Sequence, residues 1–140
     1  KKIRYANSTE ISEKCKDPVI DLMTSQKEII NKGGTMRLGA WDCEIEKNTK
    51  SYKSYKKKLI SERHRHRYEF NNSYSDRIFD DKFIVAGSNP DTKLVEIVEN
   101  IDHPWFVGVQ FHPEYKSSVY NPHPIFVNFV KASLKKYLNK

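Results

Sequence analysis

The sequence is poor in the residues that build disulfide scaffolds and fibrous or flexible chains. It has only two cysteines, five glycines and six prolines among 140 residues. Two cysteines are too few for a disulfide framework and no signal peptide opens the chain, so we expect a cytoplasmic, reducing environment. The low glycine and proline content, together with an aromatic share of 12%, excludes a collagen-like or wholly disordered chain.

Long apolar runs are also missing. No apolar run approaches the length of about 20 residues that a membrane-spanning helix needs. Apolar residues make up 37% of the chain and charged residues 31%, so a core can form only if the apolar residues are well grouped. The composition therefore predicts one soluble domain that has no membrane partner.

Arginine is scarce although the net charge is +7. The 25 basic residues are 19 lysines and only six arginines. Lysine, isoleucine and asparagine have A- and T-rich codons, so mutational bias can supply this charge without a selected partner. Arginine makes bidentate contacts with phosphates and bases better than lysine does. We interpret the charge as a solvated lysine surface, and keep a basic nucleic-acid-binding or interaction module as the alternative.

The pattern of apolar residues predicts a mixed α/β unit that is richer in strands than in helices. Residues 6–17 are expected to form a polar loop, and Gly33–Gly34 a turn. The last element is an amphipathic helix that begins near Pro124 and carries apolar residues at 126, 129, 130, 134, 137 and 138. Strands are predicted at 18–23, 36–46, 59–71, 83–88, 93–100 and 105–111. A short exposed helix or a loop is expected at 48–58, and a short helix at 71–81.

Two side chains suited to proton transfer follow the apolar segment 105–111, which is expected to be a strand buried on both faces. Ligands in open α/β sheets bind just beyond the carboxyl ends of strands, where His112 and Glu114 would lie. A histidine there can act as a general base, and a carboxylate two residues on can orient it. A surface turn that holds both residues by chance is the alternative.

The segment 59–71 alternates with a period of two residues, so its arginines are expected on one face of a strand. Arg63, Arg65 and Arg67 would repel one another there unless an anionic group lies nearby. That group can be a carboxylate ligand, a phosphate, or a paired acid such as Glu62 or Glu69.

The histidines and cysteines give no clear sign of a metal site or of a nucleophile. His64 and His66 would share the other face of the same strand, but no third ligand has a recognised spacing. Cys15 lies between two lysines, and Cys43 lies between two acids that would raise the pKa of its thiol. Neither cysteine has the small neighbours that a nucleophile elbow between a strand and a helix requires.

Five segments in a fixed order carry a family resemblance that covers nearly the whole chain. GVQFHPE (108–114) resembles the His-x-Glu segment of class I glutamine amidotransferases, although alone it leaves other amidotransferases and γ-glutamyl hydrolases open. The complete set resembles the glutaminase domain of the CTP synthase family. The five segments of this set are ANSTE (6–10), GGTMRLG (33–39), ERHRHRYE (62–69), DHPWFVGVQFHPE (102–114) and PHPIF (122–126).

The resemblance implies a flavodoxin-like α/β fold and a Cys-His-Glu triad. In that family the cysteine attacks the glutamine carboxamide and forms a γ-glutamyl thioester. The ammonia released is used by an ATP-dependent synthase domain to aminate UTP. By motif, His112 would be the general base and acid and Glu114 would orient it, while Glu10 and Arg67 would bind glutamine through its ammonium and carboxylate groups.

The family's nucleophile elbow, oxyanion-hole glycine and first parallel strands precede the ANSTE segment, which only five residues precede here. Residues 1–140 are therefore expected to be the C-terminal part of a class I glutamine amidotransferase domain, an incomplete flavodoxin-like fold that is inactive alone. No metal or cofactor is expected in this chain. ATP, Mg and UTP would belong to the synthase domain, and GTP would be an allosteric activator. The expected partners are glutamine, the N-terminal part of the domain and the synthase domain, within a homotetramer.

Overall fold

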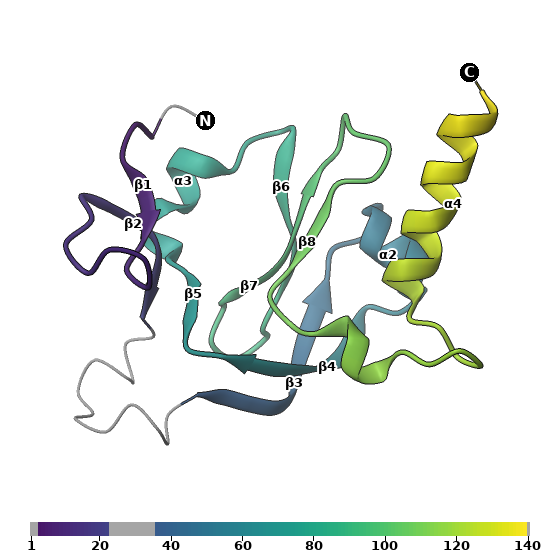
Figure 1. Cartoon of the computed structure of the whole chain (residues 1–140), viewed down its shortest axis with the longest axis horizontal. Coiled ribbons are helices and arrows are strands. Elements are labelled where there is room, and N and C mark those ends of the chain that lie inside the picture. The colour runs from purple at the N-terminus through teal and green to yellow at the C-terminus, as the bar shows by residue number, and fades with distance from the viewer. Residues whose placement is uncertain (1–2, 23–35, 140) are drawn as a thin grey trace.

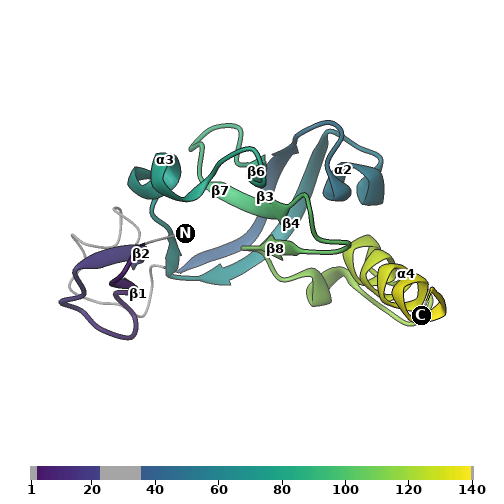
Figure 2. The ribbon, with the colours of Figure 1, turned by 90° about the horizontal axis from the view of Figure 1, so that it is seen from above.

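The computed structural model describes residues 3–22 and 36–139. These residues form two sheets and several helices, which confirms the strand-rich α/β class. Figure 1 shows the smaller sheet at one end of the molecule, the larger sheet in the middle and the C-terminal helix at the other end. The view from above in Figure 2 gives the same arrangement.

The smaller sheet contains three short strands in the order β1-β2-β5. β1 runs parallel to β2, and β2 runs antiparallel to β5. The expectation of a polar loop over 6–17 is wrong for β1, because an edge strand with exposed polar side chains shows no apolar alternation. Met23, the predicted end of β2, and the predicted Gly33–Gly34 turn lie outside the described residues. The strands are β1 (Ala6–Ser8), β2 (Asp17–Leu22) and β5 (Tyr68–Phe70).

The larger sheet contains five strands in the order β4-β3-β6-β7-β8, and all of its neighbours are antiparallel. All five strands fall within predicted strand segments. β8 is shorter than predicted and half-buried rather than buried on both faces, because it is an edge strand that pairs only with β7 in the described part of the chain. The strands are β3 (Arg37–Ile45), β4 (Leu59–His66), β6 (Phe83–Ser88), β7 (Val95–Asn100) and β8 (Val107–Val109).

The predicted strand 59–71 is divided at Arg67. β4 remains paired with β3 as far as His66, and β5 then pairs with β2 from Tyr68 onward. The chain thus passes from the larger sheet to the smaller one at a single residue. Because the alternation of residue types continues through Arg67, the sequence pattern does not reveal this change of sheet.

The core lies between the larger sheet and the short helix α2 (Lys50–Tyr55). Of the two alternatives for 48–58, the structure has the helix rather than the loop, but Ser51 within it is completely buried instead of exposed. Its backbone N–H and its hydroxyl donate to Oε1 of Glu99 at 2.7 and 2.6 Å, and the Lys50 N–H donates to Oε2 at 2.8 Å. A buried carboxylate of β7 therefore satisfies the free N–H groups at the start of α2. The core residues are Cys43, Ile45, Ile60, Ala86, Ile97 and Phe111.

The segment 71–81 is helical, as predicted. It contains the 3₁₀ turn η1 (Asn72–Tyr74) and the helix α3 (Ser75–Ile78). Asn71 caps the turn, because its side-chain oxygen accepts a hydrogen bond from the Ser73 N–H at 3.1 Å.

The C-terminal helix α4 (Pro124–Leu138) begins at the predicted proline, with His123 as its N-cap. Ile125 at its start is buried, but the predicted apolar face is exposed to solvent. The exposed fractions on the apolar face of α4 are 39% for Phe126, 53% for Phe129, 61% for Val130, 54% for Leu134, 73% for Tyr137 and 71% for Leu138.

None of the helices in the described residues is long and apolar enough to cross a membrane.

Candidate active site

The predicted proton-transfer pair lies just beyond β8. The His112 N–H donates to the Arg63 carbonyl oxygen at 2.8 Å, which holds the chain against β4. The 3₁₀ turn η2 (Pro113–Lys116) then brings Glu114 back toward the imidazole, so that Nδ1 of His112 lies 2.6 Å from Oε1 of Glu114. The Tyr115 ring stacks on the imidazole, with centroids 5.0 Å apart and an angle of 16° between the planes.

The contact between His112 and Glu114 fixes the chemistry of the imidazole. The hydrogen bond from His112 holds the pKa of the Glu114 carboxyl below its ordinary value, so this carboxylate is an acceptor at neutral pH. Nδ1 of His112 must therefore carry a proton, and Nε2 is the atom that can accept another. The pair has the geometry of a general base with an orienting carboxylate.

Arg67 lies at the junction between the two sheets and is half-buried. Its Nε atom is buried and has no hydrogen-bond partner among the described residues. Oε2 of Glu69 is likewise buried without a partner, and burial raises the pKa of this carboxyl. A guanidinium in this state can bind the carboxylate of a ligand.

Glu10 lies in the turn that follows β1 and is exposed. The turn is fixed by Thr9, whose N–H donates to the Ile20 carbonyl oxygen at 3.0 Å and whose hydroxyl donates to Asp21 at 2.9 Å. β2 in turn pairs with β5 next to Arg67. The structure thus places Glu10 beside the smaller sheet, Arg67 at the junction of the two sheets and His112 beside the larger one. No hydrogen bond or ion pair joins these three residues in the described part.

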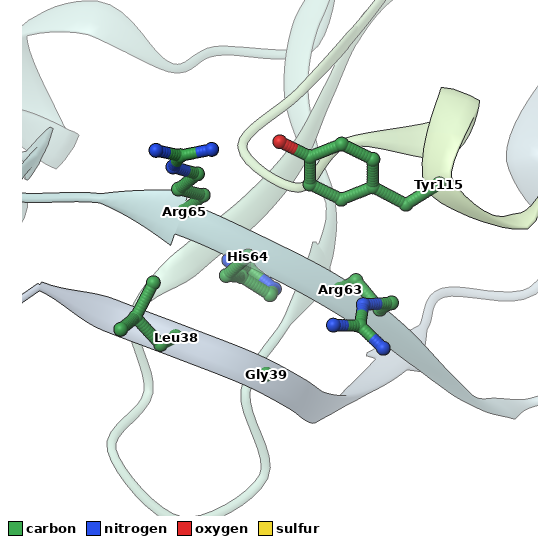
Figure 3. A pocket seen from close by; sticks show the side chains of 6 residues that line it. All are labelled: Leu38, Gly39, Arg63, His64, Arg65 and Tyr115. Carbon is green, nitrogen blue, oxygen red and sulfur yellow. The ribbon is translucent and has the colours of Figure 1, made fainter.

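Arg63 and Arg65 project from the exposed side of β4 into a pocket of about 490 Å³. Figure 3 shows Tyr115 reaching over β4, with its hydroxyl directed toward the side of Arg65. The arginines do not pair with Glu62, which was one of the expected alternatives, because Glu62 lies on the opposite face of β4. There it accepts hydrogen bonds from Tyr55 and His123 at 2.9 and 3.0 Å. This face is therefore open to an anionic ligand. The pocket is lined by Leu38, Gly39, Arg63, His64, Arg65 and Tyr115.

His64 and His66 share one face of β4, as expected, and bond to each other rather than converging on a metal. Nδ1 of His64 lies 2.9 Å from Nε2 of His66. Burial lowers the pKa of His64 to about 3 and that of His66 to about 4, so both rings are neutral at pH 7. No group of three or more potential metal-binding side chains occurs in residues 3–22 and 36–139.

The sequence pattern did not single out Glu96, which lies in β7 beneath these histidines and is buried. Its carboxylate is 2.6 Å from the Arg37 guanidinium and 3.7 Å from Nε2 of His64. Burial raises the pKa of Glu96 to about 7, although Arg37 opposes this shift. The available signal was a pair of acids inside the otherwise apolar strand VEIVEN, since a buried acid needs a partner.

The two cysteines are not part of the His112 site. Cys43 is fully buried in the core, and burial raises the pKa of its thiol to about 12. A side chain at Gly87 would place its Cβ 2.8 Å from the Cys43 sulfur, so the thiol is tightly enclosed. Cys15 is half-buried in the loop between β1 and β2, with Thr9 and Tyr68 lining the same pocket.

Comparison with known proteins places these features in a family. The class I glutamine amidotransferase family model matches residues 7–132. The CTP synthase of Flavobacterium johnsoniae is 61% identical over 129 residues, which cover 92% of this chain and 24% of that protein. The CTP synthase of Clostridium kluyveri is 56% identical over 133 residues, covering 95% and 25%. The chain thus spans about a quarter of the length of the curated relatives it matches.

Solved structures agree with this result. The glutaminase domain of Trypanosoma brucei CTPS with bound acivicin superposes with a TM-score of 0.83 at 36% identity, covering 94% of this chain and 51% of that one. A Thermoplasma acidophilum protein named as a GMP synthase subunit shares the fold, with a TM-score of 0.55 at 21% identity over 76% of this chain and 50% of that one. The sequence, the fold and the family match over 7–132 together make this chain a member of the class I glutamine amidotransferase family.

Proposed function

We propose that this chain supplies the general base and the glutamine-binding residues of the glutaminase reaction in a CTP synthase. The observation that carries the proposal is the 2.6 Å contact between His112 and Glu114. It occurs in a chain that is 53–61% identical to CTP synthases over nearly its whole length.

In this proposal His112 moves the protons of the reaction. Nε2 accepts the proton of the attacking thiol, and the sulfur bonds to the carboxamide carbon of glutamine. As the C–N bond breaks, the imidazolium returns the proton to the leaving nitrogen, which departs as ammonia. Water then cleaves the thioester to give glutamate and regenerate the thiol. Glu114 holds Nδ1–H throughout, so the ring keeps the orientation and tautomer that both steps need.

The nucleophilic thiol of this reaction does not come from Cys15 or Cys43. Cys43 is enclosed in the core with a raised pKa, and Cys15 lies in the loop before β2. Treatment with a glutamine analogue that carries a chloroketone is therefore expected to label neither cysteine selectively. Stoichiometric labelling of one of them, prevented by glutamine and located by mass spectrometry, would assign the nucleophile to that residue instead.

Arg67 and Glu10 bind the two charged groups of glutamine in this proposal. The guanidinium of Arg67 supports the carboxylate contact, because it is half-buried and makes no ion pair with the described residues, so it gains from an anionic partner. The exposed Glu10 supplies a charge opposite to that of the substrate ammonium group.

The wider setting is proposed from the family resemblance. ATP, Mg and UTP are assigned to a synthase domain that receives the ammonia, and GTP is assigned the role of an allosteric activator. Arg63 and Arg65 line one pocket and make no ion pair within residues 3–22 and 36–139, which supports this role because they offer positive charge to phosphate groups. The assembly is proposed to be a cytoplasmic homotetramer.

The test is a chimera in which this chain replaces the matching segment of the F. johnsoniae CTP synthase, to which it is 61% identical. CTP formation is measured with glutamine or with ammonium chloride as the nitrogen donor. The proposal expects both activities in the chimera and no glutaminase activity from the 140-residue chain alone. A chimera that uses ammonium chloride normally but cannot use glutamine would overturn it.

The alternative, a nucleic-acid-binding module, is tested by titrating duplex DNA with the 140-residue chain at several salt concentrations. Contacts with phosphates make binding strongly dependent on salt. We expect only weak retention that disappears at physiological salt. Submicromolar binding that persists there would favour the module.

A further inference from the structure

The main-chain carbonyl of Tyr68 lies where the two sheets meet. It accepts a hydrogen bond from Nδ1 of His66 at 3.0 Å and a second from the side-chain amide of Gln110 at 3.3 Å. Both donors lie on the side of the larger sheet. His66 is the last residue of β4. Gln110 directly follows β8, and its backbone N–H donates to the Glu96 carbonyl oxygen of β7 at 2.9 Å. Tyr68 itself begins β5 of the smaller sheet.

This carbonyl determines which nitrogen of His64 and of His66 carries the proton. A carbonyl oxygen can only accept, so Nδ1 of His66 must be protonated. Because burial keeps His66 neutral, its Nε2 is then an acceptor, and Nδ1 of His64 donates to it at 2.9 Å. The two rings therefore form a directed chain of hydrogen bonds that ends on the Tyr68 carbonyl.

The other end of this series of hydrogen bonds lies among buried charged groups without a hydrogen bond of its own in the described residues. Nε2 of His64 lies 3.7 Å from the Glu96 carboxyl, which is held 2.6 Å from the Arg37 guanidinium. The Arg37 guanidinium in turn lies 4.6 Å from the centre of the Trp41 ring. His64, Glu96 and Arg37 are all at least nine-tenths buried, so the series of hydrogen bonds begins at a ring that is enclosed by the larger sheet.

We propose that His66 and Gln110 are positioning residues that hold the Tyr68 carbonyl and thereby fix Arg67 relative to His112. The inference rests on the proposed function, in which Arg67 binds the glutamine carboxylate. Arg67 immediately precedes the held carbonyl, and Gln110 lies two residues before His112. The hydrogen bonds on one oxygen atom thus join the segment that binds the substrate to the segment that transfers its protons.

Two variants of His66 separate hydrogen bonding from packing. His66→Leu keeps a side chain of similar size but has no donor. His66→Asn is smaller, but its amide nitrogen is attached to Cγ, as Nδ1 of histidine is, and can still donate to the Tyr68 carbonyl. The proposal expects Leu to raise the glutamine KM about tenfold and Asn to raise it about twofold, with kcat nearly unchanged in both, as loss of one hydrogen bond implies. The measurement is glutamine-dependent CTP formation by the chimera.

Gln110→Met provides an independent variant, because methionine matches glutamine in length and lacks its amide. We expect about a fivefold increase in glutamine KM from this change alone. The effects of the His66 and Gln110 substitutions on KM should not be independent, since both side chains donate to one oxygen atom. The combined effect of His66→Leu and Gln110→Met is therefore expected to differ from the product of the single effects by at least about threefold. His103→Gln, at an exposed histidine, is the control and should leave KM unchanged.

The outcomes distinguish this inference from the proposed function. If the unmodified chimera does not use glutamine, the proposed function fails. If it does, and His66→Asn is as poor as or poorer than His66→Leu, packing rather than the hydrogen bond is responsible and the inference is overturned. Independent effects of the His66 and Gln110 variants, or a loss confined to kcat, would also overturn it. Calorimetric titration with glutamine should reproduce the KM ranking as a ranking of dissociation constants.

Discussion

Nδ1 of His112 lies 2.6 Å from Oε1 of Glu114 across a single intervening proline. The contact is local, because both residues belong to the turn that follows β8. It is also partly open to solvent, since 36% of the His112 side chain and 55% of the Glu114 side chain are exposed. A substrate can therefore reach the imidazole.

His112→Ala in the chimera is expected to lower glutamine-dependent CTP formation by about 1,000-fold, the scale of general acid–base catalysis. Ammonium-dependent formation should be unchanged, because that reaction needs no proton transfer at the carboxamide. CTP production with each nitrogen donor measures both values. Equal loss with ammonium chloride would show that the substitution damages the fold rather than the chemistry.

Glu114→Ala is expected to cost less than His112→Ala, because the base remains and only its orientation is lost. Removing a hydrogen bond to a charged group is expected to lower glutamine-dependent kcat by about 10- to 100-fold. Glu114→Gln is the matched variant that keeps the size of the side chain without its charge. If either change proved as damaging as His112→Ala, Glu114 would have a direct role in the reaction.

Arg67→Ala is expected to raise the glutamine KM by about 10- to 100-fold with a small effect on kcat, because a contact to the carboxylate is present before and during the reaction. Arg77→Ala, at an exposed arginine outside both proposed binding sites, is the control and should leave the glutamine KM near normal. Saturation curves for glutamine measure both. A comparable rise from Arg77→Ala would mean that general positive charge, rather than Arg67, attracts the substrate.

The buried histidines should make stability depend on pH. The folded-state pKa values of about 3 for His64 and about 4 for His66 lie below the ordinary 6.5, so between pH 4.5 and 6.5 the unfolded chain binds protons that the folded chain does not. Burial raises the pKa of Glu96 to about 7 and also raises that of Glu69, and both carboxyls act in the opposite direction. The contribution of the histidines, which lowers stability as the pH falls, is therefore isolated by substitution.

The melting temperature of the chimera between pH 4.5 and 6.5 tests this dependence. His66→Asn removes one of the two histidines, so on lowering the pH its melting temperature is expected to fall less, or rise more, than that of the unmodified chimera. An equal or larger fall in the variant would show that His66 is protonated in the folded state.

The exposed face of α4 predicts the behaviour of the 140-residue chain in isolation. Six apolar side chains of this helix are between 39% and 73% exposed, which favours self-association. Phe129→Glu combined with Leu134→Lys is expected to reduce the associated fraction, as measured by sedimentation. Sharp, cooperative melting of a monomeric, unmodified chain would contradict the expectation.

The sequence predicts local features of this protein better than features that depend on the meeting of distant segments. The strand 36–46, the helix from Pro124 and the turn after Asn71 each follow from residues within one element. His112 and Glu114 also lie within one turn, so their contact was accessible from their spacing alone.

Features made by residues far apart in the sequence were not predictable from a pattern. The change of sheet at Arg67 is decided by which strands pair with β4 and β5, not by the residue types between them. The burial of Ser51 depends on Glu99, 48 residues away. Likewise, the role of Glu96 requires Arg37 and His64 to lie opposite it, which only the assembled sheet shows.

The change of sheet at Arg67 has a consequence for which amino acids could react. Under the proposed function, the charged end of the substrate is held beside the smaller sheet, and the carboxamide must reach His112 beside the larger one. The distance between the two sheets then determines the side-chain length that permits hydrolysis. Asparagine, shorter by one methylene, would bind through the same charged groups but hold its carboxamide short of the imidazole. Discrimination between the two amides would thus come from the spacing of whole sheets, with no need for a pocket wall that excludes the smaller one.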